Sequence, residues 1–310
     1  MSAAAAAVAS SIGKHRLTIS NSISSFRSMR NALDPNMKIG FVPTMGALHD
    51  GHLSLLKRAR TDNDVVIASI FVNPTQFGVG EDLDKYPRQF EKDTAMLSQL
   101  GVDHVFAPNT DDMYSKNHMM YIDPTGFDDI PEGTSRPGHF RGVATIVTKL
   151  FNIVQPSNAY FGQKDAAQCV LIRRLVEDLN MMDLNVVICD TVREKDGLAM
   201  SSRNAYLESD ERAVAPILYQ SLCSAQKLYQ HSSGSSISSQ ELVDNVKSVI
   251  QSEPLVSEIQ YISVDNLQTM KPIQEVSRED GAVISLACKV GKVRLIDNIV
   301  LEPLPNGLAD

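Results

Sequence analysis

The pattern of apolar and polar positions between residues 38 and 190 predicts alternating strands and helices. Short apolar runs, as expected for buried strands, are followed by longer stretches with apolar residues at helical spacing. The predicted strands cover residues 39–42, 65–72, 104–107, 119–122, 159–161 and 185–189. The predicted helices cover residues 51–61, 87–100, 143–154 and 166–179. This alternation is typical of an α/β fold, with a mostly parallel sheet covered by helices on both faces.

The pattern changes after residue 190. A polar, irregular segment is followed by residues that predict helices at 209–230 and 240–251, separated by a serine-rich connector at 232–239. Three further strands are predicted at 258–264, 282–289 and 292–299. We therefore expect a larger domain over residues 17–190 and a smaller C-terminal α+β domain over residues 191–310.

Residues 1–16 are a separate segment, rich in alanine and serine. No acidic residue occurs before Asp34, which fits an organellar presequence. Residues 17–33, however, already read as a strand followed by a helix. The segment 1–16 is thus either a disordered tail or a short presequence, and the expected location is cytoplasmic, with mitochondrial as the alternative.

Composition narrows the class of protein. The net charge of −8 argues against general binding to nucleic acid. No apolar run approaches the ~20 residues that a membrane-spanning helix needs. The cysteines are scattered without a CxxC pair, as in a protein of a reducing compartment. They are Cys169, Cys189, Cys223 and Cys288.

Three polar loops directly follow predicted strands, at residues 43–51, 73–80 and 162–165. In parallel sheets, ligands bind at the carboxyl ends of strands, near the point where the strand order reverses. We therefore expect these loops to meet at one edge of the sheet and to form a binding site there.

The first of these loops leads into a helix. Asp50 is the predicted N-cap, and His49 and His52 lie three residues apart on one face of the helix start. A helix N-terminus favours anions such as phosphate, to which two imidazoles can donate hydrogen bonds. A zinc site is the alternative for paired histidines, but no third and fourth ligand occurs at a suitable spacing.

Several stretches together resemble one known family. Residues 43–52, PTMGALHDGH, contain a His-x-Gly-His motif, and residues 73–78, 136–143, 160–165 and 196–204 follow as NPTQFG, RPGHFRGV, YFGQKD and DGLAMSSRN. In this order they resemble the pantoate–β-alanine ligases, or pantothenate synthetases, of the nucleotidylyltransferase superfamily. The resemblance covers about residues 17–300. It implies a Rossmann-like nucleotidylyltransferase domain, with the C-terminal domain acting as a lid.

The resemblance also implies a reaction. ATP and pantoate form an enzyme-bound pantoyl adenylate and pyrophosphate, and β-alanine then attacks the acyl carbon, releasing pantothenate and AMP. The substrates are accordingly ATP, pantoate and β-alanine, with Mg²⁺ as a cofactor and a homodimer as the expected assembly. Catalysis of such a phosphoryl transfer depends mainly on positioning and electrostatic stabilisation. The product belongs to the biosynthesis of pantothenate and coenzyme A.

The family's site residues can be carried over to matching positions. The catalytic candidates are His52, His49, Lys164 and Arg203. The predicted ATP-binding residues are Met45, Gly46, Ala47, Leu48, His49, Asp50, Gly51, His52, Gly162, Gln163, Lys164, Asp165, Val192, Met200, Ser201, Ser202 and Arg203. Gln76 and Gln168 are the predicted pantoate ligands, and Gln76 also the β-alanine ligand, because a neutral amide can match both a hydroxyl and a carboxylate. No direct metal ligand is predicted.

Four other residues are additional candidates. Asp93 could hold magnesium through water, while Arg136 and Arg141 could stabilise a lid. Tyr86 is the fourth candidate and has no assigned role. Two other functions stay open at this point. One is a nucleotidyl transferase that releases its conjugate, against which the 73–77 loop argues. The other is a silent nucleotide-binding scaffold, against which the presence of every expected catalytic group argues.

Overall fold

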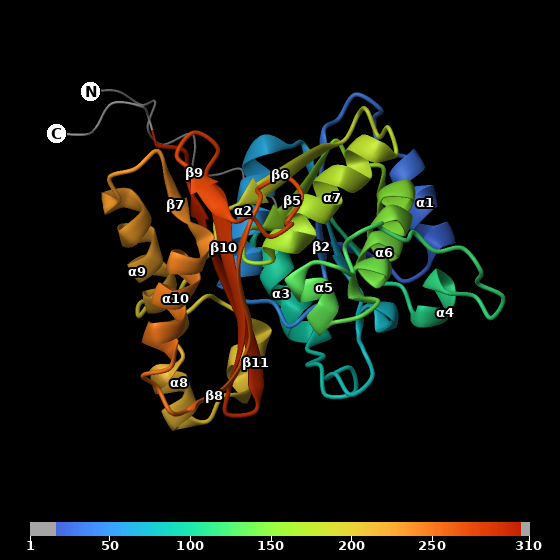
Figure 1. Ribbon diagram of the computed structural model, residues 1–310. Helices are drawn as coiled ribbons and strands as arrows, with labels where there is room; N and C mark the ends of the chain where they lie inside the picture. Colours follow the sequence, from blue (N-terminus) through green and yellow to red (C-terminus); the bar gives the residue numbers. More distant parts are fainter. Residues whose placement is uncertain (1–16, 305–310) are drawn as a thin grey trace, which may run out of the picture.

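The structure is a computed structural model and describes residues 17–304. Residues 1–16, which the sequence assigns to a tail or presequence, lie outside the described part. Two layered units follow one another along the chain (Figure 1). None of the helices within residues 17–304 has the length and apolar character required to span a membrane.

The first unit contains a six-stranded sheet in which all neighbouring strands are parallel. The strand order is β1-β4-β3-β2-β5-β6. The strands are β1 (Thr18–Ser20), β2 (Ile39–Thr44), β3 (Val65–Ile70), β4 (His104–Phe106), β5 (Asn158–Gly162) and β6 (Asn185–Cys189). The chain builds one half of the sheet outward from β2 and then returns to place β5 on the other side of β2. The order therefore reverses between β2 and β5, which is where such sheets bind ligands.

The predicted strand at 119–122 is wrong. These residues are irregular and belong to no sheet, and the side chains of Met119 and Met120 are 83% and 79% exposed. The N–H of Ile122 donates to the Thr145 hydroxyl oxygen at 2.9 Å, so this segment is tied to a helix and not to a strand. The other five strands predicted for this unit are confirmed, and β1 confirms the expected strand in residues 17–33.

Helices cover both faces of the sheet. Helices α1 (Ile23–Asn31), α6 (His139–Val154) and α7 (Ala166–Asp178) contribute to one apolar cluster. Helices α2 (Asp50–Asp62) and α3 (Phe90–Gln99) contribute to a second cluster on the opposite face. Short helices α4 (Thr110–Met113), α5 (Pro131–Ser135) and η1 (Pro74–Gln76) lie in the connections. The predicted α/β architecture is confirmed.

The second unit has the predicted α+β composition. An antiparallel sheet of β8 (Val256–Asp265), β10 (Ala282–Val290) and β11 (Val293–Leu301) is covered on its outer side by α9 (Ile217–His231) and α10 (Ser239–Ile250) (Figure 1). The helix predicted over 209–230 is interrupted, because Pro216 separates α8 (Ser209–Val214) from α9. The serine-rich connector contains β7 (Ser236–Ser238), which pairs with β9 (Glu275–Ser277). A short helix η2 (Ser202–Tyr206) precedes this unit's helices.

Polar and apolar contacts join the two units. Glu132 on α5 accepts two hydrogen bonds from the Arg294 guanidinium, at 3.1 and 2.7 Å, and one from the Tyr261 hydroxyl at 2.9 Å. Met270 and Val283 of the second unit also pack in the main apolar cluster of the first. Asn298 of β11 also donates to the carbonyl oxygens of Gln163 and Lys164, so the second sheet contacts the chain directly after β5.

Candidate active site

The loops after β2, β3, β5 and β6 meet in one open cleft with an empty volume of about 1390 Å³. That volume includes space open to solvent, so the cleft is a broad groove and not an enclosed cavity. The cleft is lined by most of the residues predicted to bind substrates. They are Met45, His49, Gly51, His52, Gln76, Gly162, Lys164, Asp165, Gln168, Val192, Met200, Ser201, Ser202 and Arg203. The remaining predicted residues, Gly46, Ala47, Leu48, Asp50 and Gln163, are adjacent in the chain but do not line it.

Asp93 explains why the turn before α2 has its shape. Its carboxylate is 1% exposed and accepts hydrogen bonds from the N–H groups of Ala47 and Leu48, both at 2.9 Å. Gly46 and Ala47 have positive φ angles of 81° and 51°, so the turn is left-handed and needs this support. This geometry assigns Asp93 to support of the turn, and its candidate role of holding magnesium through water stays a prediction.

The two histidines of the His-x-Gly-His motif have defined tautomers. His49, and not Asp50 as predicted, is the N-cap of α2, and its Nδ1 accepts the N–H of Gly51 at 3.2 Å. The His49 N–H in turn donates to Nδ1 of His52 at 3.4 Å. Since a neutral imidazole has one donor and one acceptor nitrogen, both rings carry their proton on Nε2. Two Nε2–H donors therefore remain for a ligand.

Both histidines are neutral near pH 7. Burial, followed by the positive charge of Lys164, lowers the pKa of His49 to about 4. Burial and the neighbouring His49 lower the pKa of His52 to about 3. The ring centroids are 4.1 Å apart, so two imidazolium ions would also repel each other. The pair is suited to donate hydrogen bonds to an anion, and not to act as a strong acid.

Glycine is required beside these rings. A Cβ atom at Gly51 would lie 2.8 Å from Cε1 of His49 and 2.9 Å from its Nδ1. A side chain at position 51 would thus displace the capping ring from the helix N-terminus. The Gly of the motif is explained by this packing.

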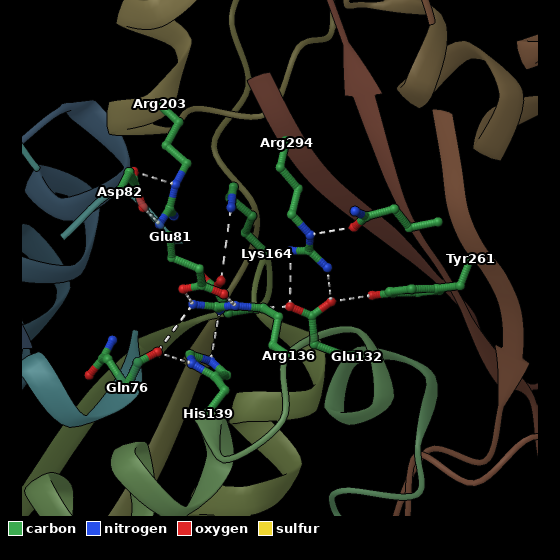
Figure 2. A network of polar contacts seen from close by, with 12 residues as sticks. Gln76, Glu81, Asp82, Glu132, Arg136, His139, Lys164, Arg203, Tyr261 and Arg294 are labelled. Atoms are coloured by element: carbon green, nitrogen blue, oxygen red, sulfur yellow. Dashed lines mark hydrogen bonds and ion pairs between the residues drawn. The ribbon is translucent and has the colours of Figure 1, made fainter. Parts of the chain in front are cut away.

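Two cationic side chains approach the cleft from other loops (Figure 2). The Lys164 ammonium, in the loop after β5, lies 3.9 Å from Asp165 Oδ1. Arg203, in η2, donates two hydrogen bonds to the Asp82 carboxylate at 3.0 and 2.8 Å. The Ser201 hydroxyl oxygen accepts the Arg203 N–H, and the Ser202 and Tyr86 hydroxyls are 3.4 Å apart. Positive charge from two directions suits a polyphosphate.

The Gln76 amide is oriented by its own loop. Asn73, which is 1% exposed, donates from Nδ2 to the Gln76 Oε1 at 3.0 Å. The Asn73 Oδ1 is held by the hydroxyls of Thr75 and Tyr114 at 3.0 and 2.9 Å. With Oε1 engaged, the Gln76 amide presents its NH₂ group to the cleft. Gln168 on α7 lines the same part of the cleft, and its side chain has no hydrogen-bond partner within residues 17–304.

His139 is a residue whose role sequence reasoning missed. Its Nδ1 donates to the Gln76 carbonyl oxygen at 2.8 Å, and its Nε2 lies 3.0 Å from the Arg136 guanidinium (Figure 2). Arg136 also forms two hydrogen bonds of 2.7 Å with Glu81. Burial, followed by Arg136, lowers the pKa of His139 to about 4, so this ring accepts from Arg136 and stays neutral. The RPGHFRGV stretch pointed to the segment but not to this contact.

Arg141 does not reach the cleft. Its guanidinium lies 4.2 Å from the centre of the Tyr121 ring, and unlike Arg136 it is not among the residues that line the cleft. Within residues 17–304 no group of three or more His, Cys, Asp or Glu side chains could hold a metal ion. Two carboxylates that line the cleft, Asp165 and Asp190, have no arginine partner among these residues.

The sequence and the fold can be compared with known proteins. The family model described as Pantoate-beta-alanine ligase matches residues 18–300. A pantothenate synthetase from Fervidobacterium nodosum is 50% identical over 279 residues, which cover 89% of this chain and 96% of the relative. A pantothenate synthetase from Thermodesulfovibrio yellowstonii is 49% identical over 264 residues, covering 85% and 92%.

Solved structures agree with these relatives. The crystal structure of pantothenate synthetase from Thermus thermophilus superposes with a TM-score of 0.85 at 40% identity, covering 92% of this chain and all of that one. Pantoate-beta-alanine ligase from Francisella tularensis, complexed with beta-gamma ATP and beta-alanine, gives a TM-score of 0.74 at 40% identity over 92% and 98%. The family match, the relatives and the shared fold all agree: this chain belongs to the pantoate–β-alanine ligase family.

Proposed function

We infer that this chain catalyses the ATP-dependent condensation of pantoate with β-alanine, through an enzyme-bound pantoyl adenylate. The observation that carries this is the convergence, at the reversal point of a parallel sheet, of two Nε2–H donors and two cations beside a pair of glutamines. The donors and cations suit a triphosphate, and the amides suit a hydroxy acid. The reaction releases AMP and pyrophosphate and supplies pantothenate for coenzyme A biosynthesis.

In the first step, a pantoate carboxylate oxygen attacks the α-phosphorus of ATP, and the bond to pyrophosphate breaks. Negative charge moves onto the phosphoryl oxygens and the leaving group. His49 and His52 donate from Nε2 to these oxygens, while Lys164 and Arg203 neutralise the developing charge. Because the donors are already oriented by the backbone, no reorganisation is needed when the charge appears.

Arg203 has to change partner when ATP binds. It is held by two hydrogen bonds to Asp82, which lines a neighbouring pocket that shares Arg203 and Lys164 with the cleft. The triphosphate carries more negative charge than one carboxylate, so it competes for the same guanidinium. This exchange would draw Met200, Ser201 and Ser202 over the nucleotide, with the Val192 and 162–165 backbone facing the adenosine half.

In the second step, the β-alanine nitrogen attacks the acyl carbon of the adenylate. The new C–N bond forms as the C–O bond to AMP breaks, and a proton leaves the nitrogen. The NH₂ group of Gln76 binds the pantoyl group first and the β-alanine carboxylate afterwards, and Gln168 binds the pantoyl hydroxyls. Neutral amides allow two anionic substrates to occupy neighbouring positions without a fixed opposing charge.

Mg²⁺ would enter with the triphosphate, since this ion prefers phosphate oxygens, water and one or two carboxylates. The cleft carboxylates Asp165 and Asp190 fit that donor set. When bound, the ion screens charge on the triphosphate and stabilises the leaving group. The protein's part is to orient the phosphates through His49, His52 and Lys164.

We also propose that residues 17–190 form the nucleotide- and pantoate-binding domain and that residues 191–310 act as a lid, excluding water that would hydrolyse the adenylate. A homodimer in the cytoplasm is the expected assembly and location. The four free thiols support a reducing compartment. Sedimentation equilibrium of the purified protein would test the assembly. Fractionation of cells that express it would test the location, including the mitochondrial alternative.

The function is tested by supplying ATP and pantoate with and without β-alanine. Pantothenate and AMP should form only when all three substrates are present. If a nucleotide conjugate of the acid is released as the final product, the chain is a nucleotidyl transferase and the ligase proposal fails.

Single variants test the roles of the residues. Lys164→Ala and His52→Ala should abolish adenylate formation while the protein stays folded, whereas Gln76→Ala should weaken pantoate binding more than ATP binding. Arg141→Ala removes a positive charge outside the cleft and serves as the control. Wild-type turnover by either of the first two variants would contradict the proposed charge stabilisation.

A further inference from the structure

Two neighbouring residues of β11 contact the loop that carries Lys164 and the turn that leads to Arg203. Asp297 and Asn298 are each 3% exposed and lie in the middle of the strand, paired with Leu286 and Ser285 of β10. Successive side chains of a strand point to opposite faces, so these two can reach in different directions. They belong to the second unit, while Lys164 belongs to the first.

Asn298 holds the loop that carries Lys164. Its Nδ2 donates to the carbonyl oxygens of Gln163 and Lys164, at 2.9 and 2.8 Å. Its Oδ1 accepts from the Gln163 side-chain amide at 3.2 Å. The bonded carbonyls belong to the peptide units on either side of the Lys164 Cα atom. They therefore fix the direction in which the lysine side chain leaves the backbone.

Asp297 holds the base of the loop that carries Arg203. Its carboxylate accepts two hydrogen bonds from Arg193, at 2.7 and 3.0 Å. The Arg193 guanidinium also stacks 3.6 Å from the centre of the Tyr219 ring and donates to the Gly197 carbonyl oxygen at 3.2 Å.

This anchored turn leads directly into η2. Arg193 pairs with Ala199, and the N–H of Met200 donates to the Val192 carbonyl oxygen at 3.0 Å. The orientation of residues 200–203 is thus set from the turn that Asp297 secures.

We propose that Asp297 and Asn298 are positioning residues for the phosphoryl-transfer step, and that they set the Lys164 and Arg203 loops in register with each other. Neither residue lines the substrate cleft itself. They act through the backbone of the loops, from a single rigid strand, so both cations address the same phosphates. This proposal rests on the phosphate-binding roles proposed above for Lys164 and Arg203.

Asn298→Ala removes the Nδ2 group that donates both hydrogen bonds to carbonyl oxygens of the Lys164 loop. A misplacement of about 1 Å in a catalytic group can cost on the order of 10²-fold in rate. We therefore expect kcat to fall at least about 10-fold, while the KM for pantoate stays within about 2-fold. Tyr229→Phe is the matched control, because it also removes one donor to a main-chain carbonyl, that of Glu302, at a site remote from the cleft. It should leave kcat unchanged.

Double-mutant cycles on ATP affinity, measured by calorimetry in the presence of Mg²⁺, distinguish the proposed positioning role from a merely structural one. This readout does not require turnover. Asn298→Ala should weaken ATP binding several-fold in the wild-type background and much less in the Lys164→Ala background. Asp297→Asn, which is isosteric, should couple to Arg203→Ala in the same way and provides a second variant if Asn298→Ala does not fold.

Three outcomes would overturn the proposal. They are a kcat for Asn298→Ala within about 2-fold of wild type, an equal loss in Tyr229→Phe, or additive losses in both cycles. Failure of the ligase function is a separate result, since it would appear as absence of pantothenate with the wild-type protein. The binding cycles would still report whether the two residues act through the cation loops.

Discussion

The packing of α6 on the Gln76 loop leads to a sharp prediction for Gly142→Ala. A Cβ atom at this position would lie 2.3 Å from the Thr75 carbonyl oxygen and 2.7 Å from the Gln76 Cα atom. An ordinary contact begins near 3.4 Å, so the loop would have to move away from the helix by roughly 1 Å. The Asn73 side chain, which orients the Gln76 amide, also donates to the Gly142 carbonyl oxygen at 3.2 Å.

The effects on stability and on catalysis should differ in size. Overpacking costs about 1–3 kcal/mol, and replacing a helical glycine by alanine returns about 1 kcal/mol. The net loss of about 0–2 kcal/mol lowers Tm by at most about 8 °C. A shift of about 1 Å at a substrate ligand can lower the rate by on the order of 10²-fold. We expect kcat/KM for pantoate to fall about 10- to 100-fold, with a nearly unchanged KM for ATP.

The assay is steady-state formation of pantothenate with pantoate varied, alongside thermal unfolding of the same preparations. Asn152→Ala, on the exposed face of α6, is the control, because it changes the helix without touching the loop. The reasoning is refuted if Gly142→Ala keeps kcat/KM for pantoate within about 3-fold of wild type. It is also refuted if the control shows the same loss.

Three further predictions concern groups around the cleft. Asp93→Asn replaces an acceptor of two N–H groups and should cost about 1–3 kcal/mol in unfolding free energy. The Mg²⁺ concentration required for turnover should not change, and a higher requirement would support a role for Asp93 in holding magnesium. Nitrogen-15 NMR should show His49 and His52 as neutral Nε2–H tautomers at pH 6, and protonated rings at that pH would contradict this. The free energy of unfolding should fall as pH drops from about 6.5 towards 4, because the unfolded chain then binds protons that the buried rings do not. Asn73→Ala frees the Gln76 amide and should raise the KM for pantoate several-fold, with ATP binding as the internal reference.

Much of the fold follows from local sequence pattern. The apolar runs that became β2, β3 and β5 are buried on both faces, and burial of this kind leaves a clear signal. The run at 119–122 has the same apolar character but no neighbouring strand to pair with, and its exposed methionines show that apolar content alone does not make a strand. The amphipathic pattern continues across Pro216, so the pattern alone predicts one helix, although the proline divides it into two.

The candidate site was predictable where residues lie close in sequence or match a family motif. His49, His52 and Lys164 meet because their loops follow adjacent strands. Asn298 could not be found this way, since an asparagine in a C-terminal strand carries no local sign of a contact with residues 134 and 135 positions earlier. A carboxylate near a nucleotide loop suggested a role with magnesium for Asp93, whereas its hydrogen bonds to the Ala47 and Leu48 N–H groups had no sign in the local sequence.

The two nitrogens of His49 face different requirements. Nδ1 completes the first turn of α2, while Nε2–H faces the cleft. By the usual preferences for helix starts, asparagine, serine or aspartate would stabilise this position better than histidine. Such a change would improve thermal stability and remove the donor from the substrate. Attempts to make this enzyme more heat-resistant by optimising helix N-caps should therefore not change position 49. The substitution that stabilises the helix start through the cap position also removes the Nε2–H donor that activity needs.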